Sequence, residues 1–301
     1  MTPIRVRNIE KSYSGVQALR GVSFEVSPGE LFGIIGPDGA GKTTLFRILT
    51  TLMLADKGKA SVMGLDLVKD YMEIRKKVGY MPGRFSLYQD LTVEENLDFF
   101  ATVFKTKVEE NYRLIKEIYV QLEPFKKRRA GALSGGMKQK LALCCALIHK
   151  PEVLFLDEPT TGVDPVSRKE FWEMLDRLKK QGIAILVSTP YMDEAGLCDR
   201  IALINEGKFM TIDTPQGIVD SYGETIWSVE GSRMSELLKT LRKVPQVKTA
   251  FAFGDVHHAT VRSGFTVDAL KALLTKEGYA DAAVREIKPG IEDVYMLLAG
   301  K

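Results

Sequence analysis

The sequence predicts an α/β fold with a mixed-sheet core, followed by a small α+β domain. Apolar runs such as Leu31–Ile35 and Val153–Leu156 have the composition of buried parallel strands, and helical patterns alternate with them up to about residue 220. In residues 221–301 the apolar patterns follow the order β-α-β-β-α-β. That order is typical of a ferredoxin-like domain. We therefore predict domains at 1–220 and 221–301.

The composition of the chain narrows the classes of protein. Apolar residues make up 45% and charged residues 27% of its 301 residues, as in ordinary globular proteins. A net charge of +3 does not indicate a nucleic-acid or anionic-membrane partner. Cys144 and Cys145 are adjacent and Cys198 is distant, which predicts no disulfide framework or metal cluster and fits a reducing cytoplasm. No apolar run approaches the ~20 residues that span a bilayer, and the N-terminus lacks the apolar core of a signal peptide.

The first chemical motif follows the strand predicted at Leu31–Ile35. The segment Gly36–Thr44 fits the P-loop pattern G-x-x-x-x-G-K-[ST], and a helix begins directly after it. In this arrangement backbone N–H groups and the helix N-terminus face phosphate oxygens. Lys42 can reach the β- and γ-phosphates, and the Thr43 hydroxyl can ligate Mg²⁺. The predicted nucleotide-binding residues are Gly36, Pro37, Asp38, Gly39, Ala40, Gly41, Lys42, Thr43 and Thr44.

A helical region at about 85–150 interrupts the pattern of strands. It opens with a capping box of Thr92 and Glu95, and apolar residues then recur at helical spacing. We expect most of its aromatic side chains to pack in a core. His149, at the end of the region, is expected to be a cation at a helix C-terminus.

Two acidic residues end the apolar strand that follows this region. Asp157 is predicted to hold Mg²⁺, directly or through water, together with Thr43. Glu158 follows at once, where its carboxylate could polarise a water for attack on a γ-phosphate. P-loop, Mg²⁺ ligand and candidate base together indicate hydrolysis of a nucleoside triphosphate.

Further motifs resemble those of ABC-type ATPases. Leu133–Gln139, with the sequence LSGGMKQ, resembles the signature motif of that family, and Glu158–Pro165 resembles its D-loop, with Asp164 as the acidic residue. P-loop, signature, acidic strand end and D-loop occur in the family's order, so the resemblance covers about residues 1–220. Tyr13 matches the A-loop, which implies stacking on adenine. Residues 221–301 resemble the accessory domain of ATP-binding subunits of ABC-2-type exporters.

The resemblance implies a composite site for Mg-ATP. Two such domains would pair head to tail, with the ATP on one P-loop held against the signature of the other. The signature residues are Ser134, Gly135, Gly136 and Met137. The second ATP-binding domain can be another copy or a different chain. The helical region, with Phe85–Leu91 before it, would receive a helix of an ABC-2-type membrane permease, which implies a cytoplasmic protein bound to the inner face of the plasma membrane.

Two positions depart from the family's pattern. The family normally has glutamine where this chain has Gly83, and histidine where it has Pro190. The first contacts Mg²⁺ and the attacking water, and the second contacts the γ-phosphate. We therefore predict a P-loop site that binds Mg-ATP well and hydrolyses it slowly, in a chain whose intact signature completes a partner's site. Arg84 and Gln89 are close to Gly83 in sequence, but spacing does not indicate that either replaces the missing glutamine.

The leading hypothesis is the ATP-binding subunit of an ABC exporter. One alternative is a non-transport ABC ATPase that acts as a switch on nucleic acid or ribosomes. Such proteins usually carry a long coiled coil, zinc insertions or tandem ATPase domains, and the sequence shows none of these, so no nucleic-acid partner is expected. A second alternative is a regulatory ATP-binding subunit with little turnover, which slow hydrolysis alone does not distinguish from a motor.

Overall fold

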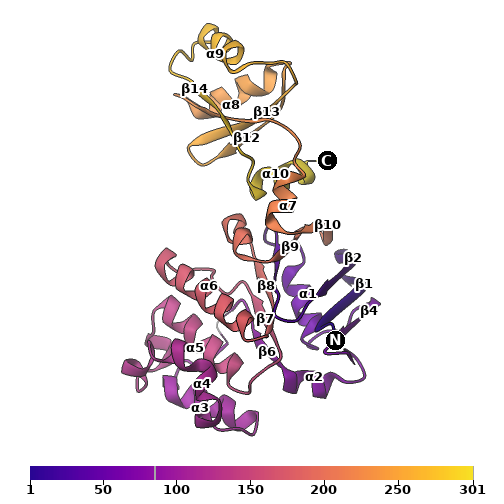
Figure 1. Ribbon diagram of the computed structural model, residues 1–301, viewed down its shortest axis with the longest axis vertical. Coiled ribbons are helices and arrows are strands. Elements are labelled where there is room, and N and C mark those ends of the chain that lie inside the picture. The colour runs from indigo at the N-terminus through magenta and orange to yellow at the C-terminus, as the bar shows by residue number, and fades with distance from the viewer. Residues whose placement is uncertain (85, 301) are drawn as a thin grey trace. The chain divides into compact units, whose positions relative to one another are not determined.

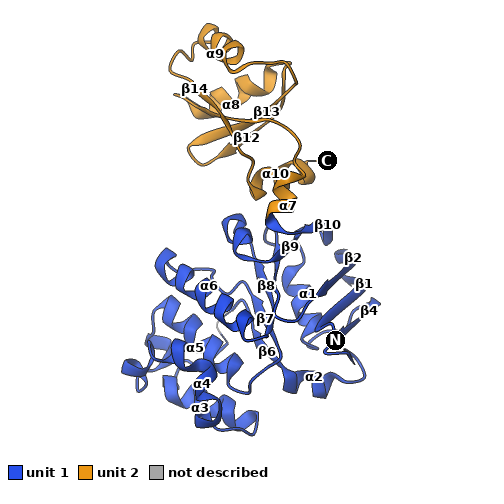
Figure 2. Ribbon diagram, viewed as in Figure 1, with its two compact units in different colours: residues 1–215 blue, residues 216–301 orange. Residues whose placement is uncertain are grey.

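The computed structural model describes residues 1–84 and 86–300 and divides into two compact units. The units are residues 1–215 and 216–301 (Figures 1 and 2). The helix α7 (Pro215–Asp220) lies at the junction, so the division falls at the start of this helix rather than after residue 220. Within the described residues, no helix is both long enough and apolar enough to cross a membrane.

The central sheet of the first unit has the strand order β10-β9-β3-β8-β7-β6. Its inner strands pair in parallel, and β9 and β10 form an antiparallel hairpin at one edge. Strands β3, β7 and β8 are buried along their whole length, which explains their continuous apolar composition. Parallel strands bring their carboxyl ends to one edge of the sheet, where ligands bind in such folds. The strands are β3 (Leu31–Ile35), β6 (Val78–Met81), β7 (Val153–Asp157), β8 (Ala184–Thr189), β9 (Arg200–Asn205) and β10 (Lys208–Asp213).

A second, antiparallel sheet with the order β2-β1-β4-β5 packs against the first through α1 (Figure 1). Both sheets contribute to one apolar core, in which Phe24 stacks on Phe32 with ring centroids 5.3 Å apart. In the same core, Phe46 of α1 meets Phe155 edge to face. These elements are β1 (Ile4–Tyr13), β2 (Val16–Val26), α1 (Lys42–Leu49), β4 (Lys57–Val62), β5 (Leu65–Asp66) and α2 (Tyr71–Lys77).

The helical region forms as expected from its capping box and periodicity. The Thr92 hydroxyl accepts a hydrogen bond from the Glu95 amide at 3.3 Å, and the Glu95 carboxylate accepts one from the Thr92 amide at 2.7 Å. Buried Lys140 pairs with Glu170 at 2.5 Å and so joins α5 to α6. The helices are α3 (Val93–Val103), α4 (Val108–Tyr119), α5 (Gly135–Leu147) and α6 (Pro165–Lys180), with short 3₁₀ turns at Glu123–Phe125, Ala130–Ala132 and Met192–Leu197.

The expectation that His149 is a helix-end cation is wrong. Its ring stacks on Phe104 with centroids 3.7 Å apart, and its Nε2 lies 3.0 Å from the carbonyl oxygen of Val78. Burial lowers the pKa of the His149 imidazole, and the hydrogen bond to Val78 only partly opposes this. The ring is therefore neutral and half-buried, because the end of the preceding helix places it against Phe104, the residue that follows α3.

This burial predicts a pH dependence of stability. A histidine with a lowered pKa in the folded state binds its proton more readily when the chain unfolds. The free energy of unfolding should therefore fall as the pH drops below about 6.5, the ordinary histidine value, toward the lower pKa of the folded state. We expect a His149→Gln variant to lose less stability than the parent between about pH 7.5 and about pH 5.5, as measured by chemical denaturation. An equal loss of stability in both proteins would contradict the conclusion that the pKa of His149 is lowered in the folded state.

The second unit has the strand order expected of a split βαβ domain. Its sheet runs β12-β13-β11-β14 with antiparallel neighbours, and α8 and α9 bury apolar side chains such as Leu237 and Leu270 against it. The elements are β11 (Ile226–Glu230), α8 (Met234–Lys243), β12 (Val247–Phe253), β13 (Val256–Val261), α9 (Val267–Lys276), β14 (Ala283–Ile287) and α10 (Ile291–Ala299).

Candidate nucleotide-binding site

The glycine loop connects the end of β3 to the start of α1. The Gly36 amide donates to the carbonyl oxygen of Thr189 at 3.3 Å, which holds the loop against the end of β8. A Cβ at Gly36 would overlap the backbone oxygen of Ile204, and Gly41 adopts a positive φ of 103°. Glycine is therefore required at both positions. The loop delivers the chain into α1 at Lys42, and the first N–H groups of that helix suit an anion.

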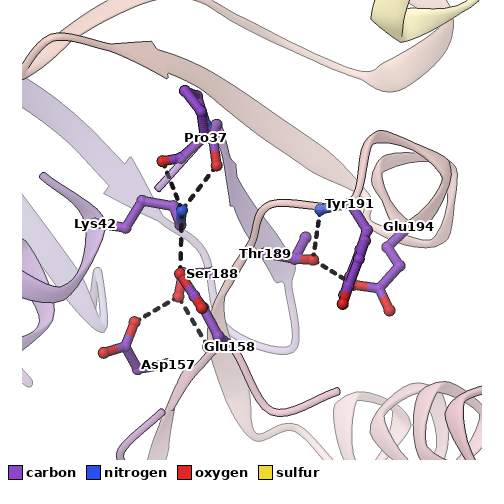
Figure 3. A network of polar contacts seen from close by, with 9 residues as sticks. Pro37, Lys42, Asp157, Glu158, Ser188, Thr189, Tyr191 and Glu194 are labelled. Atoms are coloured by element: carbon purple, nitrogen blue, oxygen red, sulfur yellow. Dashed lines mark hydrogen bonds and ion pairs between the residues drawn. The ribbon is translucent and has the colours of Figure 1, made fainter. Parts of the chain in front are cut away.

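The ammonium group of Lys42 is held by three oxygens (Figure 3). Its Nζ lies 2.7 Å from the carbonyl oxygen of Gly36, 2.9 Å from that of Pro37 and 3.1 Å from Oε1 of Glu158. The Lys42 side chain is 3% exposed and the Glu158 side chain 21%. Glu158 also has a φ of 51°, a left-handed conformation that is strained for this residue type. The candidate base and the phosphate-binding lysine thus form one ion pair.

Asp157 is oriented by a serine of the neighbouring strand. The buried Ser188 hydroxyl donates to Oδ1 of Asp157 at 2.6 Å, and the Glu158 amide donates to Ser188 Oγ at 3.0 Å (Figure 3). No sequence motif marks Ser188 as a site residue. The signal that could have found it is the register of two parallel strands, since Asp157 pairs with Ser188 in the sheet.

The oxygen groups at this edge suit a magnesium ion. A carboxylate from Asp157 and a hydroxyl from Thr43 are the hard ligands that Mg²⁺ prefers, and Mg²⁺ commonly takes its other ligands from phosphates and water. Within the described residues, no group of three or more His, Cys, Asp and Glu side chains could hold a metal ion. Because Asp157 and Thr43 supply two hard oxygen ligands, they fit a metal that takes its remaining ligands from a nucleotide and water.

Tyr13 lies in the same cavity as the P-loop. This cavity has a volume of about 240 Å³, and Lys42, Thr44 and Glu158 also line it. The Tyr13 hydroxyl lies 3.4 Å from Oγ1 of Thr44 and 2.8 Å from the sulfur of Met53, while 40% of the residue stays exposed. An exposed aromatic ring beside a phosphate-binding loop is suited to stack on a base.

The two departing positions border this site. A Cβ at Gly83 would lie 3.1 Å from the backbone oxygen of Asp157 and 3.8 Å from its Oδ2. Pro190 follows Thr189, whose carbonyl oxygen accepts the hydrogen bond from Gly36. Gln89 lies elsewhere, because its backbone oxygen accepts from the Gly131 amide at 2.9 Å and its Oε1 lies 3.6 Å from the position of a Cβ on Gly131.

A buried carboxylate behind the site was not predicted from the sequence. Glu194 is 1% exposed and accepts hydrogen bonds from the hydroxyls of Thr160 and Thr189 and from Nε of Arg168 at 3.1 Å. The Tyr191 amide in turn donates to Oγ1 of Thr189 at 3.0 Å (Figure 3). Glu194 therefore ties the end of β8 to the D-loop segment, and no sequence motif marks it.

The signature residues lie at the start of α5, against the D-loop helix. Ser134 caps α5 by accepting a hydrogen bond from the Met137 amide at 3.3 Å. Asp164 caps α6 in the same way, and the hydrogen bond from the Ser167 amide lowers the pKa of its carboxyl group. A Cβ at Gly135 would lie 3.2 Å from the Gly162 oxygen. None of the described residues that line the P-loop cavity comes from the signature.

The contact between these two helix starts predicts a sensitive glycine. A Cβ at Gly136 would lie 2.5 Å from Oγ and 2.6 Å from Cβ of Ser167. Gly136→Ala should therefore lower the free energy of unfolding by about 1–3 kcal/mol, the usual cost of overpacking. Adding Ser167→Gly removes both opposing atoms and should restore most of the loss in a denaturant titration. A double variant as unstable as Gly136→Ala alone would contradict this explanation.

Comparison with known proteins identifies the family of the chain. A family model described as ABC transporter matches residues 19–161. The chain is 37% identical to the probable multidrug ABC transporter ATP-binding protein YbhF of Escherichia coli (strain K12), over 99% of this chain and 52% of that protein. It thus spans about half the length of that relative. It is 34% identical to Nod factor export ATP-binding protein I of Rhizobium sp. (strain N33), over 99% of this chain and 97% of the relative.

A solved structure shows the same fold. The dimeric, post-hydrolysis state of the ATP-binding cassette MJ0796, bound to ADP and Pi, matches with a TM-score of 0.63 and 25% identity, over 70% of this chain and 98% of that one. The first unit of this chain therefore shares the fold of an ATP-binding cassette. The chain therefore belongs to the ABC transporter family of ATP-binding proteins.

Proposed function

We propose that this chain is the ATP-binding subunit of an ABC exporter, and that its own P-loop site binds Mg-ATP and hydrolyses it slowly. The observation that carries the proposal is the ion pair of Lys42 and Glu158 at one cavity beside Tyr13, with Asp157 directly before Glu158 at the end of the same buried strand. Two relatives support the transport role, since one is named a multidrug transporter protein and the other a Nod factor export protein.

The proposed binding step uses the P-loop, Tyr13 and the two candidate ligands of Mg²⁺. Lys42 and the amides of the loop from Gly36 to Thr44 would hold the phosphates, and Tyr13 would stack on the adenine. Thr43 and Asp157 would hold Mg²⁺, which when bound neutralises negative charge on the phosphates. Ser188 keeps the Asp157 carboxylate aimed by its hydrogen bond of 2.6 Å.

Hydrolysis needs the Glu158 carboxylate to leave Lys42. A γ-phosphate would compete for the ammonium group that Glu158 now contacts at 3.1 Å. The released carboxylate could then orient a water and accept its proton. Gly83 and Pro190 offer no side-chain donor or acceptor beside this water, and the loss of such preorganised contacts slows turnover by about 10²-fold or more.

The signature would act on a second ATP-binding domain. Ser134, Gly135, Gly136 and Met137 form a helix start that can accept a phosphate, and they lie outside the chain's own P-loop cavity. ATP would therefore join two domains head to tail, with Asp164 of the D-loop near the junction. The relative of known structure is dimeric. The second domain can be another copy or a different chain. A partner whose own site hydrolyses ATP faster would complement the slow site proposed here.

A separate cavity suits a helix of an ABC-2-type permease. It has a volume of about 400 Å³ between β6, α3 and α5, and Tyr80, Phe100 and Ala142 are among the residues that line it. Burial, followed by the negative charge of Asp157, raises the pKa of Tyr80 to about 12. Phe85, which the sequence analysis assigned to the same surface, lies outside the described residues.

This assembly would place the chain in the cytoplasm, at the inner face of the plasma membrane, through the permease. Residues 221–301 would serve as its accessory domain. A regulatory subunit with little turnover stays a second candidate, because Gly83 and Pro190 weaken the chemistry. In the assembled complex, Glu158→Gln should slow transport if the site is part of the motor, and should leave it unchanged if the subunit is regulatory.

The rate of ATP hydrolysis by the purified chain tests the proposal directly. We expect a turnover far below the ordinary enzyme median of about 10 s⁻¹, together with retained ATP binding. A turnover near that median would overturn the slow-site assignment. Isolation of the membrane complex that contains the chain, with identification of its other subunits, tests the export role, and a complex without a membrane permease would overturn it.

A further inference from the structure

Tyr13, which is proposed to stack on adenine, lies at the tip of a two-stranded hairpin. It pairs with Val16 across a two-residue turn of Ser14 and Gly15, both of which have a positive φ. In the part of the chain that the structure describes, β1 pairs with β4 as far as Glu10, so the last three residues of β1 have a strand neighbour on one side. A two-stranded ribbon is marginally stable by itself in water. The position of the Tyr13 ring therefore depends on contacts outside the hairpin.

The segment between α1 and β4 supplies such contacts through Asp56. Its Oδ1 lies 2.6 Å from the ammonium group of Lys11, and its Oδ2 accepts a hydrogen bond from the Ser12 amide at 2.7 Å. The Asp56 amide donates to the carbonyl oxygen of Glu10 at 2.9 Å. One residue thus binds all three residues that precede Tyr13 in the chain.

The negative charge of Asp56 strengthens these contacts. The hydrogen bonds from the Lys11 side chain and the Ser12 amide lower the pKa of the Asp56 carboxyl group, so the group is ionised at neutral pH. Lys11 in turn holds its ammonium group 6.0 Å from the centre of the Tyr13 ring, within the range of a cation–π contact. Removal of the carboxylate would therefore release both the backbone and the cation beside the ring.

The hydroxyl end of Tyr13 is held from the same segment. It donates to the sulfur of Met53 at 2.8 Å and lies 3.4 Å from Oγ1 of Thr44 in α1. Met53 and Asp56 belong to one short connection, residues 50–56, which leads away from the helix that begins at the P-loop. This connection therefore fixes the distance between the Tyr13 ring and the phosphate-binding loop.

We propose that Asp56 is a positioning residue for the nucleotide base, which holds the Tyr13 ring where it can stack on adenine. The inference rests on the proposed function, because it takes Tyr13 as the stacking surface. A ring that is already ordered loses less freedom when a base stacks on it, so the affinity for the nucleotide is higher. Asp56 is not among the described residues that line the P-loop cavity, so binding of the phosphates should not depend on it.

Two ligands separate the contribution of the base from that of the phosphates. The β,γ-imido analogue of ATP contains adenosine and resists hydrolysis, whereas inorganic tripolyphosphate contains three linked phosphates and no adenosine. Isothermal titration calorimetry of the purified full chain with Mg²⁺ measures both affinities. Tyr13→Ala should weaken binding of the analogue by about tenfold, the usual effect of losing one stacked base. Asp56→Ala should weaken it by about fivefold, the effect of ordering one loose side chain on binding. Both variants should bind tripolyphosphate as the parent does.

A double variant shows whether Asp56 acts through the ring. The variant with both Tyr13→Ala and Asp56→Ala should bind the analogue as weakly as Tyr13→Ala alone, because no ring is left to position. Glu25→Ala is the matched control, since Glu25 pairs with Arg5 at 2.7 Å at the other end of the same two strands and its side chain is 48% exposed, against 42% for Asp56. The control should leave both affinities unchanged.

The possible failures are distinct. A parent chain that binds neither ligand would overturn the proposed ATP binding itself. Unchanged affinity of Tyr13→Ala for the analogue would overturn the stacking role of Tyr13 and the role of Asp56 with it. A loss in Tyr13→Ala but not in Asp56→Ala would overturn the positioning role and leave the proposed function intact. Weaker binding of tripolyphosphate by Asp56→Ala, a further loss in the double variant, or an equal loss in Glu25→Ala would each show that Asp56 supports the fold in general, and would overturn the positioning role.

Discussion

The double substitution Gly83→Gln and Pro190→His should raise ATP turnover by about 10²-fold, the effect of restoring preorganised contacts at a reacting phosphate. The geometry allows the first change, because a Cβ at Gly83 would lie 3.1 Å from the Asp157 oxygen and needs only a small shift of its neighbour. The side chain of a glutamine at position 83 would therefore begin beside the Asp157 carboxylate. Pro190 directly follows Thr189, whose carbonyl oxygen accepts a hydrogen bond from the Gly36 amide. The side chain of a histidine at position 190 would therefore begin at the edge of the P-loop.

Single-turnover hydrolysis with ATP in limiting amount measures this gain without interference from product release. Gln89→Ala is the matched control, because Gln89 packs against Gly131 and should not affect the rate. Each single substitution should give part of the gain. If the double variant is no faster than the parent, then other residues perform the roles of the missing glutamine and histidine.

The substitution Glu158→Gln should strengthen ATP binding by about tenfold while lowering turnover by at least about 10²-fold. Binding improves because ATP must otherwise displace the Glu158 carboxylate from Lys42, a pair whose atoms are 3.1 Å apart around a lysine only 3% exposed. Turnover falls because an amide cannot accept a proton from water. Both effects come from the Glu158 carboxylate, which pairs with Lys42 before ATP binds and would accept a proton from water afterwards.

Equilibrium binding of a fluorescent ATP analogue and the rate of phosphate release measure the two effects. Glu170→Gln is the matched control, because it also removes one negative charge but from a pair with Lys140 between α5 and α6. That variant should leave ATP affinity unchanged. Equal affinity of Glu158→Gln and the parent would show that the Lys42–Glu158 pair does not compete with the nucleotide.

The features that depend on neighbours in sequence were predictable from the sequence alone. The strand, glycine loop and helix around Gly36–Thr44 form as expected, since the backbone conformation of the loop is dictated by its own glycines. The capping box at Thr92, the apolar strand that ends at Asp157 and the helix start at Ser134 follow from equally local rules. The α/β class and the order of motifs, and hence the family, follow from these local features.

Only the tertiary structure decided how distant residues meet. Ser188 aims Asp157, and Glu194 ties Thr160 to Thr189, because the parallel register of β7 and β8 brings segments about thirty residues apart into contact. The pairing of Lys42 with Glu158 and the burial of His149 likewise depend on packing between elements. A short sequence pattern carries no information on such contacts, since many side chains of the same type lie at similar spacings. The sequence by itself therefore predicted the P-loop, Asp157 and Glu158 as the groups that would bind and hydrolyse ATP. The fold decided which other side chains, such as Ser188, orient these groups.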